Sequence, residues 1–216
     1  MSALAVSVAG EDLLLLAEKA VYWPREQMLI IADIHFGKAA AFRAQGVPVP
    51  RGTTGQNLAA LDALMAVHAT RQLVFLGDFL HARAAHASAT LAAMLAWRQR
   101  HSALRLLLVR GNHDRHAGDP AAALGIEVVD EPYSVGPFSF CHHPDIDAPG
   151  YVLAGHVHPV FHLFSRNDSV RLACFVANSR RMILPAFGAF TGGYAVNPAP
   201  GERLWVSSGD AVHCVR

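Results

Sequence analysis

The chain has 216 residues, enough for one well-buried domain, and we expect a single domain over residues 1–216. Apolar residues make up 52% and charged residues 16%, which argues against an intrinsically disordered protein. The net charge is +1, from 18 basic and 17 acidic residues, and this balance argues against a protein whose main task is to coat nucleic acid.

In the first half of the chain, short apolar segments alternate with amphipathic ones. Strands are predicted at Leu4–Val8, Leu13–Leu16, Ala20–Trp23, Met28–Ala32, Leu73–Leu76 and Leu104–Val109. Helices are predicted over Lys38–Gln45, Leu58–His68 and Ser88–His101, the last with Ser88 as its N-cap candidate. This alternation is typical of right-handed βαβ units and predicts a mostly parallel sheet.

The second half of the chain contains short β-rich segments divided by Gly, Pro, Asn and Asp. They are Val128–Val135, Phe138–Cys141, Tyr151–Ala154, Val160–Phe164, Val170–Val176, Met182–Leu184, Tyr194–Val196, Leu204–Val206 and Ala211–Val215. We expect them to form a second sheet packed on the first, with helices over the outer faces. The predicted fold is therefore α/β, a four-layer αββα sandwich of two mixed β-sheets.

The three cysteines are odd in number and widely separated, without a Cys-x-x-Cys pair. This pattern argues against a disulfide framework or a structural zinc site, and we expect all three thiols to be buried. The first residues lack a basic region followed by a long apolar stretch, so we expect a cytoplasmic protein with no membrane partner.

Five short polar motifs stand out, and four of them directly follow a predicted strand. They are Asp33-Ile34-His35, Gly77-Asp78, Gly111-Asn112-His113-Asp114, Cys141-His142-His143-Pro144 and Gly155-His156-Val157-His158-Pro159. In an open α/β sheet, ligands collect in the crevice outside the carboxyl ends of the strands. We therefore expect the five motifs to meet in one site.

The side chains in these motifs are the types that hold a pair of divalent ions. The candidate ligands are the carboxylates and imidazoles of Asp33, His35, Asp78, His142, His156 and His158 and the amide oxygen of Asn112. Taken singly, each motif is more often a turn or a helix start. Their order behind apolar strands favours a metal site, and the mixed donor set suits Mn²⁺, Fe²⁺ or Zn²⁺ better than Mg²⁺.

The ordered motifs resemble the calcineurin-like metallophosphoesterase superfamily. More narrowly, the chain resembles the PdeM family of ligase-associated DNA damage response endonucleases. This closer resemblance rests on segments that extend from Trp23-Pro24 almost to the C-terminus, which include Ala32 to Lys38, Gly46 to Pro50 and Leu184 to Gly193.

The resemblance implies specific roles for the motif residues. Asp33, His35 and His158 would hold one metal, Asn112, His142 and His156 the other, and Asp78 would bridge them. His113 would reach the scissile phosphate and protonate the leaving group, with Asp114 orienting its ring. Between the adjacent His142 and His143, the His-x-Pro pattern and strand alternation select His142.

The resemblance also implies Mn²⁺ as the activator, DNA as the substrate, and repair proteins such as a ligase, a helicase or an exonuclease as partners. In such a site two cations lower the pKa of bound water from 15.7 towards roughly 7, so that a bridging hydroxide can attack a phosphodiester. Asn112 and His113, with Arg43 and Arg51, are the candidate substrate contacts. Because the net charge is only +1, we expect DNA to be bound weakly.

Two other functions are compatible with these residues. The same site could act on a small nucleotide-type substrate, as a phosphodiesterase or a phosphatase, which the near-neutral charge favours. The chain could also be a non-catalytic binding module, although every expected ligand and acid residue is present. The roles of Lys38, His81 and the segment from Pro185 to Gly193 are left open by the sequence.

Overall fold

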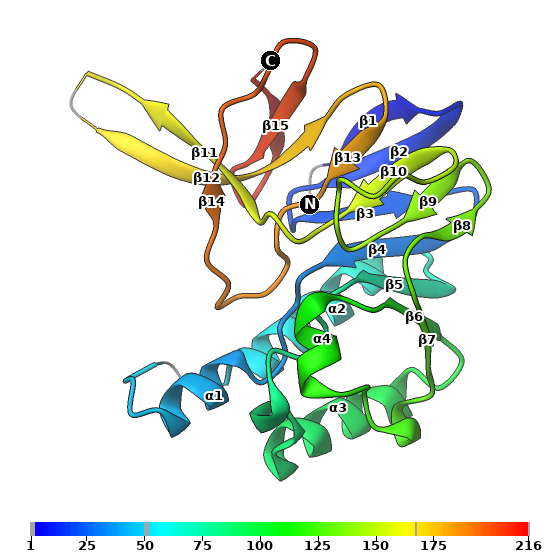
Figure 1. Ribbon diagram of the computed structural model, residues 1–216, viewed down its shortest axis with the longest axis vertical. Coiled ribbons are helices and arrows are strands. Elements are labelled where there is room, and N and C mark those ends of the chain that lie inside the picture. The colour runs from blue at the N-terminus through cyan, green and yellow to red at the C-terminus, as the bar shows by residue number, and fades with distance from the viewer. Residues whose placement is uncertain (1–2, 50–51, 167, 216) are drawn as a thin grey trace.

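The computed structural model describes residues 3–49, 52–166 and 168–215, and its core is two β-sheets packed face to face (Figure 1). The first sheet has seven strands that follow one another in chain order. They are β1 (Ala3–Val8), β2 (Glu11–Leu16), β3 (Ala20–Trp23), β4 (Met28–Ala32), β5 (Gln72–Leu76), β6 (Arg105–Val109) and β7 (Ile126–Val129). Strands β1 to β4 are antiparallel, whereas β4 to β7 are parallel.

The second sheet has nine strands and is also mixed. Its strands are β8 (Tyr133–Val135), β9 (Phe138–Phe140), β10 (Tyr151–Ala154), β11 (Pro159–Phe164), β12 (Ser169–Ala177), β13 (Arg181–Ile183), β14 (Tyr194–Ala195), β15 (Arg203–Ser207) and β16 (Val212–Cys214). Strand β10 lies between β9 and β13 and is parallel to both, so its carboxyl end opens at the same edge as theirs.

The helices lie on the free side of the first sheet, with α1 extending away from it (Figure 1). They are α1 (Lys38–Ala44), α2 (Thr53–Val67), α3 (Ser88–Arg100), α4 (Asn112–Ala117) and the short 3₁₀ turns η1 (Arg83–His86) and η2 (Ala122–Leu124). Leu61 of α2 and Trp97 of α3 are buried in one apolar cluster with Ile31 and Phe75 of the sheet. No helix in the described part of the chain is long and apolar enough to cross a membrane.

A second apolar cluster fills the space between the two sheets. It includes Trp23 from the first sheet and Phe138, Phe140 and Phe175 from the second, all nearly inaccessible to solvent. The indole N–H of Trp23 donates to the buried carboxylate of Glu11 over 2.9 Å, so this interior polar group is paired.

The predicted fold class, α/β with two mixed sheets, is confirmed, but one layer of the predicted sandwich is absent. All helices of the described residues lie between Lys38 and Leu124, and residues of α2, α3, α4 and the two 3₁₀ turns share an apolar cluster with the first sheet. On the second sheet, Ile146 and Ala148 from a loop pack on Cys141 and Val152 instead. The strand-rich second half contains no segment with helical periodicity, so the described residues offer no helix to cover this sheet.

Three smaller predictions were wrong. The segment 128–135 forms β7 and β8 in different sheets, because Pro132 cannot donate a ladder hydrogen bond and the chain crosses between sheets there. Ser88 is the first residue of α3, and its preceding cap residue Ala87 offers no side-chain bond. Cys214 is exposed, whereas Cys141 and Cys174 are buried as expected.

Candidate metal centre

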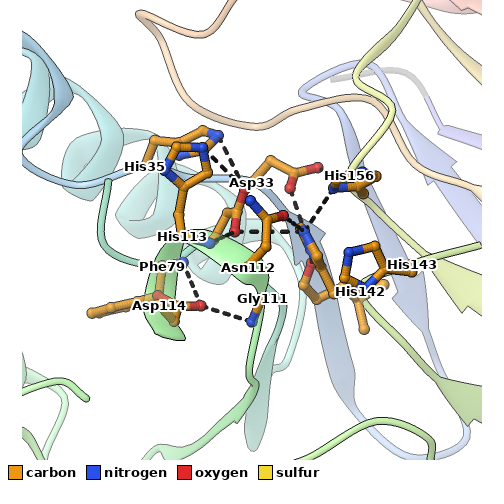
Figure 2. Close-up of polar contacts among 12 residues, drawn as sticks. Asp33, His35, Phe79, Gly111, Asn112, His113, Asp114, His142, His143 and His156 are labelled. Atoms are coloured by element: carbon orange, nitrogen blue, oxygen red, sulfur yellow. Dashed lines mark hydrogen bonds and ion pairs between the residues drawn. The ribbon is translucent and has the colours of Figure 1, made fainter. Parts of the chain in front are cut away.

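The loops after five strands bring the candidate ligands together at one edge of the two sheets (Figure 2). Four of these loops follow β4, β5, β6 and β10, and the fifth follows β9. All seven candidate ligands predicted from the sequence meet there: Asp33, His35, Asp78, Asn112, His142, His156 and His158.

The first group of donors consists of Asp33, His35, Asp78 and His158. One ligand atom from each lies within 4.8 Å of the others. The Nε2 atoms of His35 and His158 are 3.4 Å apart, and His158 Nε2 is 3.5 Å from Asp33 Oδ1. His35 Nε2 is 3.7 Å from Asp78 Oδ2. Four donor atoms at these separations can surround one small cation.

The second group is centred on the buried ring of His142. Its Nε2 atom is 2.8 Å from Asn112 Oδ1 and 3.0 Å from His156 Nδ1. The other carboxylate oxygen of Asp78, Oδ1, is 3.5 Å from the same nitrogen. The Asp78 carboxylate therefore faces both groups, with one oxygen towards each.

The chemistry of these donors fits divalent cations. Asp33 Oδ1 is buried and has no hydrogen-bond partner within the described residues, and the nearest imidazole nitrogens, of His158 and His142, lie 3.5 and 3.7 Å away. Burial lowers the pKa of His35 well below its usual value, and nearby Lys38 lowers it further. His35 is therefore neutral at physiological pH and has a lone pair to offer. Neutral imidazoles beside carboxylates are ligands of Mn²⁺, Fe²⁺ and Zn²⁺.

The backbone at these residues is strained. Asp33, His35, Asp78, His156 and His158 all have φ between 48° and 70°, in the left-handed region. They are five of the eight non-glycine residues with positive φ in the described part of the chain. Such conformations cost on the order of 1–3 kcal/mol each and cluster at functional sites, where surrounding structure holds them. The left-handed conformation changes the direction of the backbone at each of these donors, which all lie in loops outside the strands.

Two glycines make room for the donors. A Cβ on Gly77 would lie 2.0 Å from His142 Nδ1, and the residue has a φ of 77°. A Cβ on Gly155 would lie 2.6 Å from Asp33 Oδ2. Any side chain at either position would therefore displace a candidate ligand.

His113 lies beside the first donor group, at the start of α4 (Figure 2). Its backbone N–H donates to Asp78 Oδ1 over 2.9 Å, and its Nδ1 is 2.8 Å from the carbonyl oxygen of His81. The ring is stacked on that of His81, with centroids 4.8 Å apart. Its Nε2 is 4.0 Å from Asp78 Oδ2, so this nitrogen faces the donors.

Asp114 does not orient the His113 ring, which corrects the sequence-based prediction. Its carboxylate is fully buried and accepts backbone N–H bonds from Gly111, Phe79 and Leu80 at 2.9 to 3.2 Å. Burial raises the pKa of Asp114 despite these bonds. Asp114 instead ties the loop after β6 to the loop after β5. The His81 carbonyl takes the orienting role.

Strand alternation, which was expected to direct only His142 into the site, does not apply at this pair, because β9 ends at Phe140. His142 lies at the centre of the second group. The His143 ring is not directed away from it: its centroid is 4.5 Å from that of His156. A ligand nitrogen of His143 also lies within 4.8 Å of one from His142 and one from His156.

Glu131 holds this turn in place and was missed by the sequence analysis. Its carboxylate accepts the backbone N–H groups of His142 and His143 at 2.7 and 2.9 Å and pairs with His143 Nδ1 at 2.7 Å. Burial alone would raise the pKa of Glu131, but these hydrogen bonds outweigh it and hold the pKa below its usual value. A glutamate before a proline is typical of an ordinary loop, so no local sequence pattern indicated that Glu131 supports the site.

Three further candidates, Lys38, His81 and Arg43, lie in or beside α1. Lys38 is its first residue, and burial lowers the pKa of its ammonium group although Asp78 and Asp33 oppose the shift. His81, left open by the sequence, lines the site through its ring. Arg43 lies in the last turn of α1, and Arg51 lies outside the described residues. Substrate contact by either arginine stays a prediction.

Loss of the Glu131 carboxylate should weaken the second donor group selectively. We expect Glu131→Ala to lower the affinity for a second Mn²⁺ by about 10- to 100-fold, as removal of outer supports to metal ligands usually does. The first ion should bind as before. Isothermal titration with Mn²⁺ measures both affinities, and His142→Ala should abolish the second event altogether.

Glu127→Ala, which removes an exposed glutamate of β7, is the matched control and should change neither affinity. Two unaltered binding events in Glu131→Ala would show that the Glu131 carboxylate does not support the site.

Similarity to known proteins identifies the family of this chain. A model of the calcineurin-like phosphoesterase family matches residues 27–156. The crystal structure of a Pseudomonas putida nuclease, MPE, is similar at 48% identity with a TM-score of 0.88, covering 99% of this chain and 100% of that one. No curated protein gave a significant match.

A structure of a protein of unknown function from Aquifex aeolicus is more distant. It has 19% identity and a TM-score of 0.40, and the match covers 64% of this chain and 80% of that one. That likeness adds nothing to the assignment. The family match and the Pseudomonas putida structure instead confirm the superfamily expected from the ordered motifs. The chain therefore belongs to the calcineurin-like phosphoesterase family and is a metal-dependent phosphoesterase.

Proposed function

We propose that the chain is a two-metal nuclease that hydrolyses phosphodiester bonds in DNA, as part of DNA repair. The observation that carries this proposal is the Asp78 carboxylate, which directs one oxygen to each of two donor groups. A carboxylate shared in this way is what a pair of ions requires. Similarity to a nuclease from Pseudomonas putida over the whole chain supports a nucleic-acid substrate.

Each donor group is assigned one ion. Asp33, His35 and His158 would hold the first, and Asn112, His142 and His156 the second, with Asp78 common to both. We propose Mn²⁺, the activator that the family resemblance implies, with Fe²⁺ and Zn²⁺ as alternatives that suit the same mix of oxygen and imidazole donors. When bound, the ions would offset the negative charge of a phosphodiester and make water a stronger nucleophile at neutral pH.

His113 would supply the proton that the leaving oxygen needs. A carbonyl oxygen can only accept, so the His81 carbonyl holds the N–H at Nδ1 of His113. The transferable proton must then be carried by Nε2, the nitrogen that faces the donors. General acid assistance of this kind is worth about 10²–10⁴-fold in rate.

The near-neutral charge bears on which nucleic acid is cut. With a net charge of +1, the protein has little long-range attraction for duplex DNA. We propose that it grips only a few phosphates near the donors and prefers single strands or ends. The second candidate function, hydrolysis of a small nucleotide-type substrate at the same site, is favoured by that same lack of charge.

A panel of substrates tests the proposed function. The Mn²⁺-loaded protein should cleave labelled single-stranded DNA faster than duplex DNA, and the cleavage should fall only modestly between 50 and 200 mM salt because few phosphates are neutralised. Asp78→Asn should bind one ion fewer and lose most hydrolysis while it remains folded. Brisk turnover of a chromogenic diester, without cleavage of any DNA form, would favour the small-substrate alternative.

The acid role of His113 predicts a dependence on the leaving group. His113→Ala should retain two Mn²⁺ ions by metal analysis, because no ligand is lost. Its turnover should fall by about 10²-fold or more for DNA, whose alkoxide leaving group needs a proton. A nitrophenyl ester, whose leaving group is already stable as an anion, should lose far less. Equal losses for both substrates would rule out proton donation by His113.

A further inference from the structure

A row of aromatic rings leads from the donor groups to the surface near α1. The ring of His113 lies 5.0 Å from that of His35 and stacks on His81 at 4.8 Å. The His81 ring in turn lies 5.9 Å from Phe42 of α1. Phe42 meets Phe190 edge to face, also at 5.9 Å. Five rings from different parts of the chain thus form one continuous path.

The outer members of this row are only partly buried. Phe42, His81 and Phe190 all keep part of their surface open to solvent. Two other phenylalanines near the donor groups, Phe36 and Phe79, are 2% and 3% exposed. A single exposed apolar residue needs no explanation. Here, however, two phenylalanines in contact with each other stay partly accessible at the outer end of a row of rings that begins beside the donor groups.

Phe190 lies in a segment that hydrogen bonds hold in place. The chain between β13 and β14 loops from the second sheet towards the helical side (Figure 1). The backbone N–H of Phe187 donates to the Ala32 carbonyl at 2.8 Å, and that of Ala189 donates to Asn57 Oδ1 at 2.9 Å. The buried Asn57 amide also donates to the carbonyl of Ile34, which lies between Asp33 and His35. The segment is therefore tied directly to the loop that carries two candidate ligands.

We propose that Phe42 and Phe190 form a platform on which an unpaired nucleobase stacks beside the scissile phosphate. This inference rests on the proposed nuclease function and names what sets its preference for single strands. Aromatic faces bind bases of any sequence, with a gain of roughly 5- to 150-fold in affinity per base. In a duplex the bases are paired and stacked, so their faces are not available.

The platform also accounts for the low net charge. A nuclease that recognises bases by stacking needs fewer phosphate contacts than one that follows the backbone of a duplex. Lys38, which begins the helix that carries Phe42 and interacts electrostatically with Asp78 and Asp33, would supply a phosphate contact on this side. Stacking on aromatic side chains together with contacts to the backbone phosphates is a common means of binding single strands without sequence preference.

Two matched oligonucleotides test the platform. Both are single-stranded, but one lacks the bases around the cleavage position. The Mn²⁺-loaded wild-type protein should cleave the complete strand with a KM about tenfold lower than that of the abasic strand. Phe42→Ala and Phe190→Ala should raise the KM of the complete strand to that of the abasic one. In both variants, the kcat and the KM measured with the abasic strand should equal those of the wild-type protein. General misfolding would alter these two values.

A binding readout separates stacking from catalysis. A strand with 2-aminopurine beside the cleavage position should lose fluorescence on stopped-flow mixing with the wild-type protein, before cleavage. Both alanine variants should reduce that quenching. Phe164→Ala, at a phenylalanine of β11 that is 79% exposed, is the control and should behave as wild type. Phe42→Leu keeps the apolar volume and thus the fold, and should show the same defect as Phe42→Ala.

The outcomes distinguish the two proposals. Failure to cleave any nucleic acid would overturn the proposed nuclease function, and the platform with it. Cleavage of both strands with equal KM, or variants that keep the preference for the complete strand, would overturn the platform alone. In that case Phe42 and Phe190 would serve only to pack α1 against the segment before β14.

Discussion

The charge of two buried carboxylates is the constraint on which the site depends. Asp33 and Asp78 are 1% and 2% exposed, and they lie within a few ångströms of each other among imidazoles. Burial of unpaired charge is costly, and at least one oxygen, Asp33 Oδ1, has no donor within the described residues. Divalent ions would neutralise both groups, and the free energy of metal binding would offset the strain of the left-handed backbone conformations at these residues. We infer that metal binding and local stability are coupled here.

Much of the site could be predicted from the sequence because its donors follow buried strands. Short apolar segments predicted strands β4, β5, β6 and β10 at the right places in the chain. Parallel strands have their carboxyl ends at a common edge of a sheet. The convergence of Asp33, Asp78 and Asn112 therefore required only the order of the motifs. The fold class could be predicted for a related reason. The first half of the chain alternates between strand-like and helix-like spacing of apolar residues, whereas the second half has only short strand-like segments. The roles of the converging side chains as ligands stay predictions.

The remaining features depend on contacts between distant parts of the chain, which no local pattern records. Glu131, in the connection from β7 to β8, accepts a hydrogen bond from the backbone of His142 after β9. Phe190 contacts Phe42, which lies almost 150 residues earlier in the chain. The misassigned role of Asp114 has a related cause. The family resemblance implied that it orients the His113 ring, but its side chain accepts hydrogen bonds from the backbone of two loops.

The central claim is that the two donor groups share Asp78 and act as one binuclear centre. Electron paramagnetic resonance during titration of the wild-type protein with Mn²⁺ tests it directly. Two ions joined through a common carboxylate would lie ~3.5–4 Å apart and couple magnetically. The account predicts that a spin-coupled signal dominates at two equivalents of Mn²⁺. A spectrum that shows only uncoupled six-line signals at that ratio would contradict it.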